Sequence, residues 1–377
     1  LIAGLIYGLA LRRFPGLPVL EISPDLVILL LLPALIFASA RSLEPRQLKA
    51  QALPILFYST VGVLLTLFLI GLPLYGMTAL PLADALLFAS AVAATDPSAV
   101  SAIFRRFAVP EKLGAVIEGE SLFNDGTAIL LFFTMAALVI GMESFDVADT
   151  AFNFGRTVLV AMLLGSALGW MAGRLIRFWS IQNQFPGISI TLALVYGGFL
   201  LAERLLHVSG VITVMFAAWV FVFQRGPASL PHASAPTSTA ETGGHPELFV
   251  GFWDYVSQLA GGVLFFALGV TVGQHDFPFT WLIPASILVL LLARMAVIYG
   301  GGLLFFRTSQ KVPLAWQHIL VLSGLRGAVS AALVLMLPES YEYREFMLCL
   351  VLVLCLYTLV VHPFLLQIYL QRQKLED

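Results

Sequence analysis

Twelve apolar stretches follow one another along this 377-residue chain, and their lengths constrain its fold more than any other feature. Hydrophobic residues make up 59% of the sequence and charged residues only 11%, whereas soluble domains carry about 25% charged residues. A membrane-spanning helix needs roughly 20 mostly apolar residues. The pattern therefore predicts an all-α polytopic protein in a lipid bilayer, with spans at 1–11 (partial), 25–41, 52–73, 82–104, 114–140, 152–173, 187–203, 207–223, 252–273, 281–306, 314–337 and 345–369.

Positive charge alternates between the connecting loops. If the loop after the first stretch lies outside, 13 Lys and Arg residues lie inside and 5 outside, which is the bias expected of cytoplasmic loops. We therefore predict twelve helices in the plasma (inner) membrane and a cytoplasmic C-terminus. The inside set is Arg41, Arg46, Lys49, Arg105, Arg106, Lys112, Arg174, Arg177, Arg225, Arg307, Lys311, Arg372 and Lys374; the outside set is Arg12, Arg13, Arg156, Arg204 and Arg344.

Two further features bound the function. The segment 224–250 is rich in Pro, Ser, Thr, Ala and Gly, a composition typical of a flexible loop, here on the cytoplasmic side. The formal net charge is −2, and no basic arm is present, so nothing indicates a nucleic-acid partner.

Carboxylates lie deep inside two of the stretches. A charged side chain near the bilayer centre costs about 3 kcal/mol on insertion scales, and such residues usually handle ions or protons. The stretch 82–104 is interrupted at Thr95-Asp96-Pro97. Because Pro97 donates no backbone hydrogen bond and disfavours helix at Asp96, nearby carbonyls are freed. Taken alone, this pattern also fits a plain proline kink.

The stretch 114–140 places polar groups on neighbouring faces of one helix. Glu118, Ser121 and Asp125 follow the spacing i, i+3, i+7 and share a face, and Glu120 and Asn124 form an adjacent stripe. Asp125 lies about 11 residues into the helix, roughly 16 Å deep at 1.5 Å per residue. Glu118 fits an interfacial carboxylate near the cytoplasmic end, or an entrance for ions.

These residues together predict a site for a hard monovalent cation such as Na+. Oxygen ligands are available from Thr95, Asp96, Ser121 and Asp125, together with the freed carbonyls. Burial favours the protonated carboxyl, whereas a bound cation favours the carboxylate. Proton and cation would then compete for the same oxygens.

A second interrupted stretch, 314–337, breaks at Ser323-Gly324-Leu325-Arg326-Gly327 and runs opposite to the first by the loop count. Paired broken helices in two halves of a chain indicate an inverted repeat with an ion site near the midplane. Two arginines, Arg294 and Arg326, also lie within spans. We predict that Glu120 pairs with Arg294, and that Arg326 offsets the negative C-terminal end of a half-helix.

Three motifs resemble those of the cation/proton antiporter 1 family, the group of the Na+/H+ exchangers. They are similar to the family's unwound-helix, Asn-Asp and arginine motifs, in that order, and the resemblance covers essentially the whole chain. The motifs here are Ala94-Thr95-Asp96-Pro97, Glu118-Gly119-Glu120-Ser121-Leu122-Phe123-Asn124-Asp125-Gly126 and Gly324-Leu325-Arg326-Gly327-Ala328-Val329-Ser330.

The resemblance implies a sodium-proton antiporter fold of thirteen helices, of which the first would precede Leu1. It implies one transmembrane domain over 1–377, with an ion-binding core at 52–140 and 281–369 containing two crossed discontinuous helices. Residues 1–51 and 152–280 would form a scaffold and a homodimer interface. No cofactor is implied beyond the transported Na+, Li+ or K+ and H+, and no enzymatic activity.

Site residues carried over from the family match the positions already singled out. Asp125 is the implied transport carboxylate, with Thr95, Asp96 and Ser121 as ligands of Na+, and Asn124 belongs with them to the implied cation/proton-binding site. Asn124 stands where electrogenic relatives have a second aspartate, which implies electroneutral exchange. The chain departs from the family at Ala38, which follows Phe37 where relatives carry an acidic residue.

Two other classes remain open from the sequence. An intramembrane aspartyl protease would use Asp96 and Asp125 as a pair sharing a proton, but the Tyr-Asp and Gly-x-Gly-Asp signatures are missing. A transporter-derived sensor without turnover is kept open by Ala38. The choice among Na+, Li+ and K+ depends on cavity size, which the sequence does not reveal.

Overall fold

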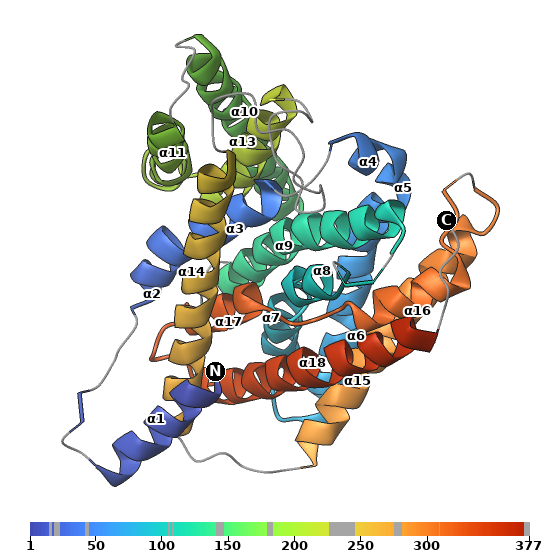
Figure 1. Ribbon diagram of the computed structural model, residues 1–377. Helices are drawn as coiled ribbons and strands as arrows, with labels where there is room; N and C mark the ends of the chain where they lie inside the picture. The colour runs from blue at the N-terminus through green and yellow to red at the C-terminus, as the bar shows by residue number, and fades with distance from the viewer. Residues whose placement is uncertain are drawn as a thin grey trace. The chain divides into compact units, whose positions relative to one another are not determined.

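The computed structural model describes residues 1–14, 17–18, 23–41, 45–104, 106–107, 109–140, 147–178, 184–225, 246–274, 281–308 and 310–372, and the regular structure in these ranges is helical (Figure 1). Seven helices there are long and apolar enough to cross a membrane: Ala52–Met77, Glu111–Ile140, Gly155–Phe178, Phe185–Leu205, Leu248–Gln274, Leu282–Phe305 and Arg344–Arg372. The chain is an all-helical, multi-pass membrane protein.

The other predicted spans are shorter or divided. Three apolar helices of 10–17 residues lie at Val27–Ala40, Leu82–Ala91 and Gly210–Gln224. The stretch 314–337 contains α16 (Leu314–Leu322) and α17 (Ala328–Leu335). A helix that stops at a break cannot reach spanning length by itself, so the count of twelve stays a prediction. The predicted loop at 224–250 falls mostly on 226–245, outside the described residues.

The chain divides into two compact units. The first comprises Leu1–Val27, Arg46–Glu143 and Gly262–Asp377. Small residues allow close packing in it: a Cβ on Gly4 or Gly8 of α1 would overlap the backbone of α14 (Pro246–Gln274). The helices assigned largely to this unit are α1 (Ile2–Arg13), α2 (Pro24–Leu26), α4 (Pro45–Ala50), α5 (Ala52–Leu56), a π-helical turn (Phe57–Val61), α6 (Gly62–Met77), α7 (Leu82–Ala91), α8 (Ser98–Phe104), α9 (Glu111–Ile140), α15 (Leu282–Phe305), α16, α17 and α18 (Arg344–Arg372).

The second unit comprises Ile28–Pro45 and Ser144–Gly261. Its helices α10 and α13 pack tightly because Gly165 and Gly169 face backbone carbonyls of α13. The buried Trp253 stacks on Phe37 at 4.4 Å between ring centroids. The helices are α3 (Leu32–Arg41), α10 (Val147–Phe178), α11 (Gln184–Leu192), α12 (Gly198–Leu200), α13 (Gly210–Arg225) and the first part of α14, with π-helical turns at Val27–Leu31, Ala193–Gly197 and Leu201–Leu205.

The two interrupted helices of the first unit begin and end alike. A proline, Pro81 or Pro313, precedes α7 and α16, with φ and ψ near −57° and 154° at both. Pro is well suited to helix starts because its φ is already fixed and no N–H is lost there. Helix α7 then runs 10 residues and α16 runs 9 before each stops. Both interruptions therefore leave backbone groups without helical partners inside an apolar unit.

Candidate functional site

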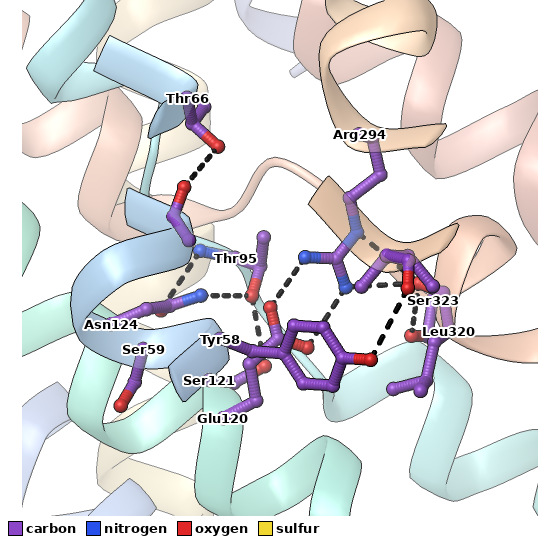
Figure 2. Close-up of polar contacts among 12 residues, drawn as sticks. Tyr58, Ser59, Thr66, Thr95, Glu120, Ser121, Asn124, Arg294, Leu320 and Ser323 are labelled. Carbon is purple, nitrogen blue, oxygen red and sulfur yellow. Dashed lines mark hydrogen bonds and ion pairs between the residues drawn. The ribbon is translucent and has the colours of Figure 1, made fainter. Parts of the chain in front are cut away.

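The first break, residues 92–97, lies between α7 and α8, where the sequence predicts it. Thr95 in its centre is 2% exposed. The side chains of α9 hold it on two sides (Figure 2): the Asn124 amide donates to the Thr95 hydroxyl at 2.7 Å and its carbonyl accepts from the Thr95 N–H at 3.4 Å. The Ser121 and Thr95 hydroxyls lie 2.9 Å apart. The Asn124 amide thus clamps the break through one donated and one accepted hydrogen bond, and its predicted place in the ion-binding site stays a prediction.

Asp125 lies one turn beyond Ser121 on α9, 8% exposed. Its Oδ1 is buried and makes no hydrogen bond to any described residue. Buried carboxylate oxygens are nearly always paired, and an unpaired one has a strong reason to take a proton or a cation. Asp125 thus has a buried, unpaired oxygen one helical turn from Ser121, whose hydroxyl contacts that of Thr95.

Asp96 contacts the second break. Its backbone N–H donates to the Leu325 carbonyl at 2.9 Å. Gly327 lies against its side chain, so a Cβ added there would come within 2.6 Å of Asp96 Oδ2. This close approach requires glycine at 327 and joins the two breaks directly.

Arg326 in the second break, residues 323–327, reaches across to the first. Its Nη1 donates to the carbonyls of Ala93 at 3.0 Å and Ala94 at 3.1 Å, just beyond the C-terminal end of α7. A cation is favourable there because the unpaired carbonyls of a helix end carry partial negative charge. The sequence predicted that Arg326 would offset a half-helix end; the structure places it at the half-helix of the other break. The freed carbonyls predicted near Thr95 thus include two that accept hydrogen bonds from Arg326.

Glu120 and Arg294 form a buried bidentate ion pair (Figure 2), with Arg294 Nη2 and Glu120 Oε2 2.9 Å apart and a second contact between Nη1 and Oε1. Arg294 also donates to the Leu320 carbonyl of α16, from Nε at 3.2 Å and from Nη2 at 2.9 Å. Paired, planar contacts of this kind are the strongest charge-assisted hydrogen bonds. The structure therefore brings together the two residues that the sequence paired.

Glu118 lies away from this cluster and contacts α8, where the Ser101 hydroxyl donates to its Oε1 at 3.0 Å. It is half-buried, which is compatible with its predicted place near one end of the span. Ala38 lies buried on α3 in the second unit.

Two contacts at the site are not predicted by the sequence. Thr358 of α18 accepts the Arg326 backbone N–H at 3.0 Å. Tyr58 lies beside Glu120 and donates to the Ile298 carbonyl at 3.2 Å (Figure 2). The available signal was weak: Thr358 is one hydroxyl in a long apolar stretch, and hydroxyls in membrane helices commonly bond to their own backbone.

Comparisons with known proteins show that the chain is similar to Na+/H+ antiporters in sequence and in fold. The family model described as "Sodium/hydrogen exchanger, transmembrane" matches residues 1–372. The chain is 31% identical to the Na(+)/H(+) antiporter NhaG of Bacillus atrophaeus over 93% of its own length and 64% of that protein's. It is 30% identical to the low-affinity Na(+)/H(+) antiporter NhaS1 of Synechocystis sp., covering 97% of this chain and 68% of the relative.

A solved structure shares the fold. The sodium proton antiporter MjNhaP1 of Methanocaldococcus jannaschii superposes with a TM-score of 0.75, over 98% of this chain and 91% of that one, at 18% identity.

Proposed function

Because this chain belongs to the sodium/hydrogen exchanger family, we propose that it is a secondary antiporter that exchanges Na+, or a similar monovalent cation, for H+ across the cell membrane. One observation carries the proposal. Asp125 is buried, and its Oδ1 has no hydrogen-bond partner among the described residues. It lies one helical turn from the paired hydroxyls of Ser121 and Thr95.

The proposed mechanism is competition for Asp125. Ionised, its carboxylate would bind the cation together with the hydroxyls of Thr95 and Ser121 and the carboxylate of Asp96. Protonated, it is neutral and no longer attracts the cation. Because the same oxygen cannot hold both, each passage of the site carries either a proton or a cation. The Glu120–Arg294 pair neutralises one neighbouring carboxylate. In the proposed cycle Glu118, which accepts from Ser101, and Asp96 keep the same charge throughout, so Asp125 alone exchanges a proton for a cation.

Electroneutral exchange follows from that charge count. Asn124 is uncharged and engaged with Thr95 through both ends of its amide. One carboxylate that alternates between one proton and one monovalent cation moves no net charge per cycle.

The architecture proposed for this function is an inverted repeat. Helices α7, α8 and α9 would correspond to α16, α17 and α18, with the two discontinuous helices crossing at their breaks. The contact of Asp96 with Leu325 and the reach of Arg326 to Ala94 support this arrangement. We further propose 52–140 and 281–369 as the moving core, 1–51 and 152–280 as the scaffold of a homodimer, and a cytoplasmic C-terminus.

Reconstituted protein tests the central step. Proteoliposomes with Asp125→Asn should show no Na+-driven change of internal pH, because the amide binds neither the proton nor the cation in exchange. Glu111→Gln, at the exposed first turn of the same helix, is the matched control and should retain the rate. Exchange by the Asp125→Asn protein would overturn the assignment.

Two further measurements separate the alternatives. Clamping the membrane potential with a K+ ionophore should leave the exchange rate unchanged, and a steep voltage dependence would contradict electroneutrality. Replacing Na+ by Li+ or K+ in the same assay determines the preferred cation. If cations bind but none is exchanged, the sensor alternative suggested by Ala38 holds. The protease alternative is excluded by membership of a transporter family.

A further inference from the structure

Buried polar atoms without partners concentrate at the two breaks. Among the described residues, buried side-chain nitrogen and oxygen atoms without hydrogen bonds belong to Asp125, Arg326, His362 and Trp219. Asp125 and Arg326 belong to the site already described. His362 contributes both of its ring nitrogens, is 2% exposed, and has no part in the mechanism given above.

His362 faces the second break from α18. It follows Thr358 by one helical turn, so the two side chains share a face, and Thr358 is the residue that accepts the Arg326 backbone N–H. The backbone of Leu322, the last residue of α16, lies beside the ring without a hydrogen bond of good geometry. Tyr357 stacks edge-on against the ring at 5.4 Å between centroids.

The same spacing occurs at the first break. There Ser121 contacts Thr95, and Asp125 follows one turn later on α9. Helix α18 repeats this with Thr358 at the break and His362 one turn later. Each break is therefore faced by a hydroxyl and, four residues on, by a titratable group with an unpaired buried atom.

Burial without a partner opposes a charge on His362. The residue is 2% exposed, and neither ring nitrogen has a hydrogen-bond partner among the described residues. A protonated imidazole would therefore be a buried charge that is paired with no carboxylate among them, which is costly. Tyr357, on α18 itself, contacts the ring edge-on.

We propose that His362 is a neutral positioning residue of the antiport site, which binds buried water at the second break. A neutral imidazole offers one donor and one acceptor. Water bridges buried polar groups that lack direct partners, and the unpaired Nε–H of Arg326 and the Leu322 carbonyl are the groups of matching polarity. The bridge would fix the end of α16 and the Arg326 side chain.

The position of the Arg326 side chain affects the proposed cation site because the two breaks are hydrogen-bonded to each other. Arg326 donates to the carbonyls of Ala93 and Ala94, and the Leu325 carbonyl accepts from the Asp96 N–H. Loss of the bridge would shift Thr95 and Asp96 and weaken cation binding, whereas Asp125 and its proton exchange stay in place. The inference rests on the proposed function only for this last step.

Hydrogen exchange at the imidazole C2 carbon, read by mass spectrometry in lipid nanodiscs, tests the neutral state on the unaltered protein. For His362 we expect slow exchange without a titration midpoint between pH 5 and 9. His318, partly exposed and bonded through Nδ1 to the Tyr299 hydroxyl at 2.8 Å, is the comparison within the same chain and should exchange faster. A titration of His362 near the ordinary histidine value of about 6.5 would overturn the proposal whether or not the protein transports.

Substitutions test the positioning role. His362→Gln retains a donor and an acceptor, so we expect the KM for Na+ to stay within twofold. His362→Leu should raise that KM at least fivefold while the maximal rate stays within twofold. Equal KM values in both variants, or a loss of maximal rate alone, would contradict positioning through hydrogen bonds. If His362→Leu fails to fold, the Gln variant and the exchange measurement still decide.

Discussion

The two breaks differ in chemistry although they are built alike. The first contains Thr95 and Asp96 and is held by side chains of α9; the second contains Arg326 and is held through its backbone by Thr358. One break therefore contributes side-chain oxygens, and the other supplies a guanidinium that binds the carbonyls of the first. Backbone groups freed inside a membrane need partners within the protein. Here each break provides hydrogen-bond partners for the backbone of the other.

The largest effect is expected when the buried ion pair between Glu120 of α9 and Arg294 of α15 is broken. Glu120→Ala leaves Arg294 buried without its carboxylate, and we expect a loss of about 3–5 kcal/mol in the free energy of unfolding. Denaturation in detergent, followed by tryptophan fluorescence, measures it.

A double variant provides the control for that measurement. Glu120→Leu with Arg294→Met replaces the whole pair by apolar groups, which is often nearly neutral, and should restore most of the stability. If the double variant is no more stable than Glu120→Ala, the pair does not act as a unit.

The contact between the breaks comes next in expected effect. Gly327→Ala places a Cβ 2.6 Å from Asp96 Oδ2 and closer still to its Cβ. Overpacking of this kind costs about 1–3 kcal/mol, and the displaced Asp96 should abolish most Na+-dependent exchange in proteoliposomes. Gly300→Ala on α15, where no atom of another described helix lies within 4 Å of the added carbon, should leave the rate unchanged. Equal exchange rates in the two variants would show that exchange does not depend on the contact between the two breaks.

Removing the clamp on the first break should have a smaller effect. Asn124→Ala takes away both hydrogen bonds to Thr95, and we expect a loss of about 1–3 kcal/mol from the unpaired groups, with a higher KM for Na+. Thr134→Val on the same helix removes only a hydroxyl bonded to the Leu130 carbonyl at 2.9 Å, and its KM should stay at the wild-type value. An unchanged KM in Asn124→Ala would mean that Ser121 alone positions Thr95.

The smallest effect is expected far from the breaks, where Tyr341 donates to the buried Asp84 in the first turn of α7. Burial and the hydrogen bond to Asp84 raise the pKa of the Tyr341 phenol above its usual value of 10.0. A raised pKa means that its stabilising contribution is present below pH 10 and is lost only as pH rises further.

Tyr341→Phe should thus lower the free energy of unfolding by about 0.5–1.5 kcal/mol, equally at pH 6 and pH 9. Denaturation of both proteins at the two pH values measures the difference. A difference that shrinks between pH 6 and 9 would contradict the direction of the shift.

The sequence was sufficient where one residue had few possible roles. Asp125 could be singled out because a deep carboxylate is costly, the breaks because Pro97 and the glycines around Arg326 interrupt apolar stretches, and the Glu120–Arg294 pair because a buried arginine needs a carboxylate. The sequence could not show which polar groups are hydrogen-bonded to each other. The amide of Asn124 is hydrogen-bonded to Thr95, and Arg326 binds carbonyls beyond a helix that is far away in the chain. Such contacts depend on how helices pack, and apolar stretches are too uniform in sequence to specify that packing.

The contact from Arg326 to the Ala94 carbonyl joins residues 232 positions apart, and this has a consequence for biosynthesis. At about 5–20 residues per second, the ribosome needs roughly 10–50 s to add that length of chain. Throughout that time the first break sits in the nascent protein with its carbonyls unpaired by Arg326. Membrane insertion of this chain therefore includes an interval in which the carbonyls of the first break lack the Arg326 partner that they have in the folded protein, and that interval ends only when the last third of the sequence is made.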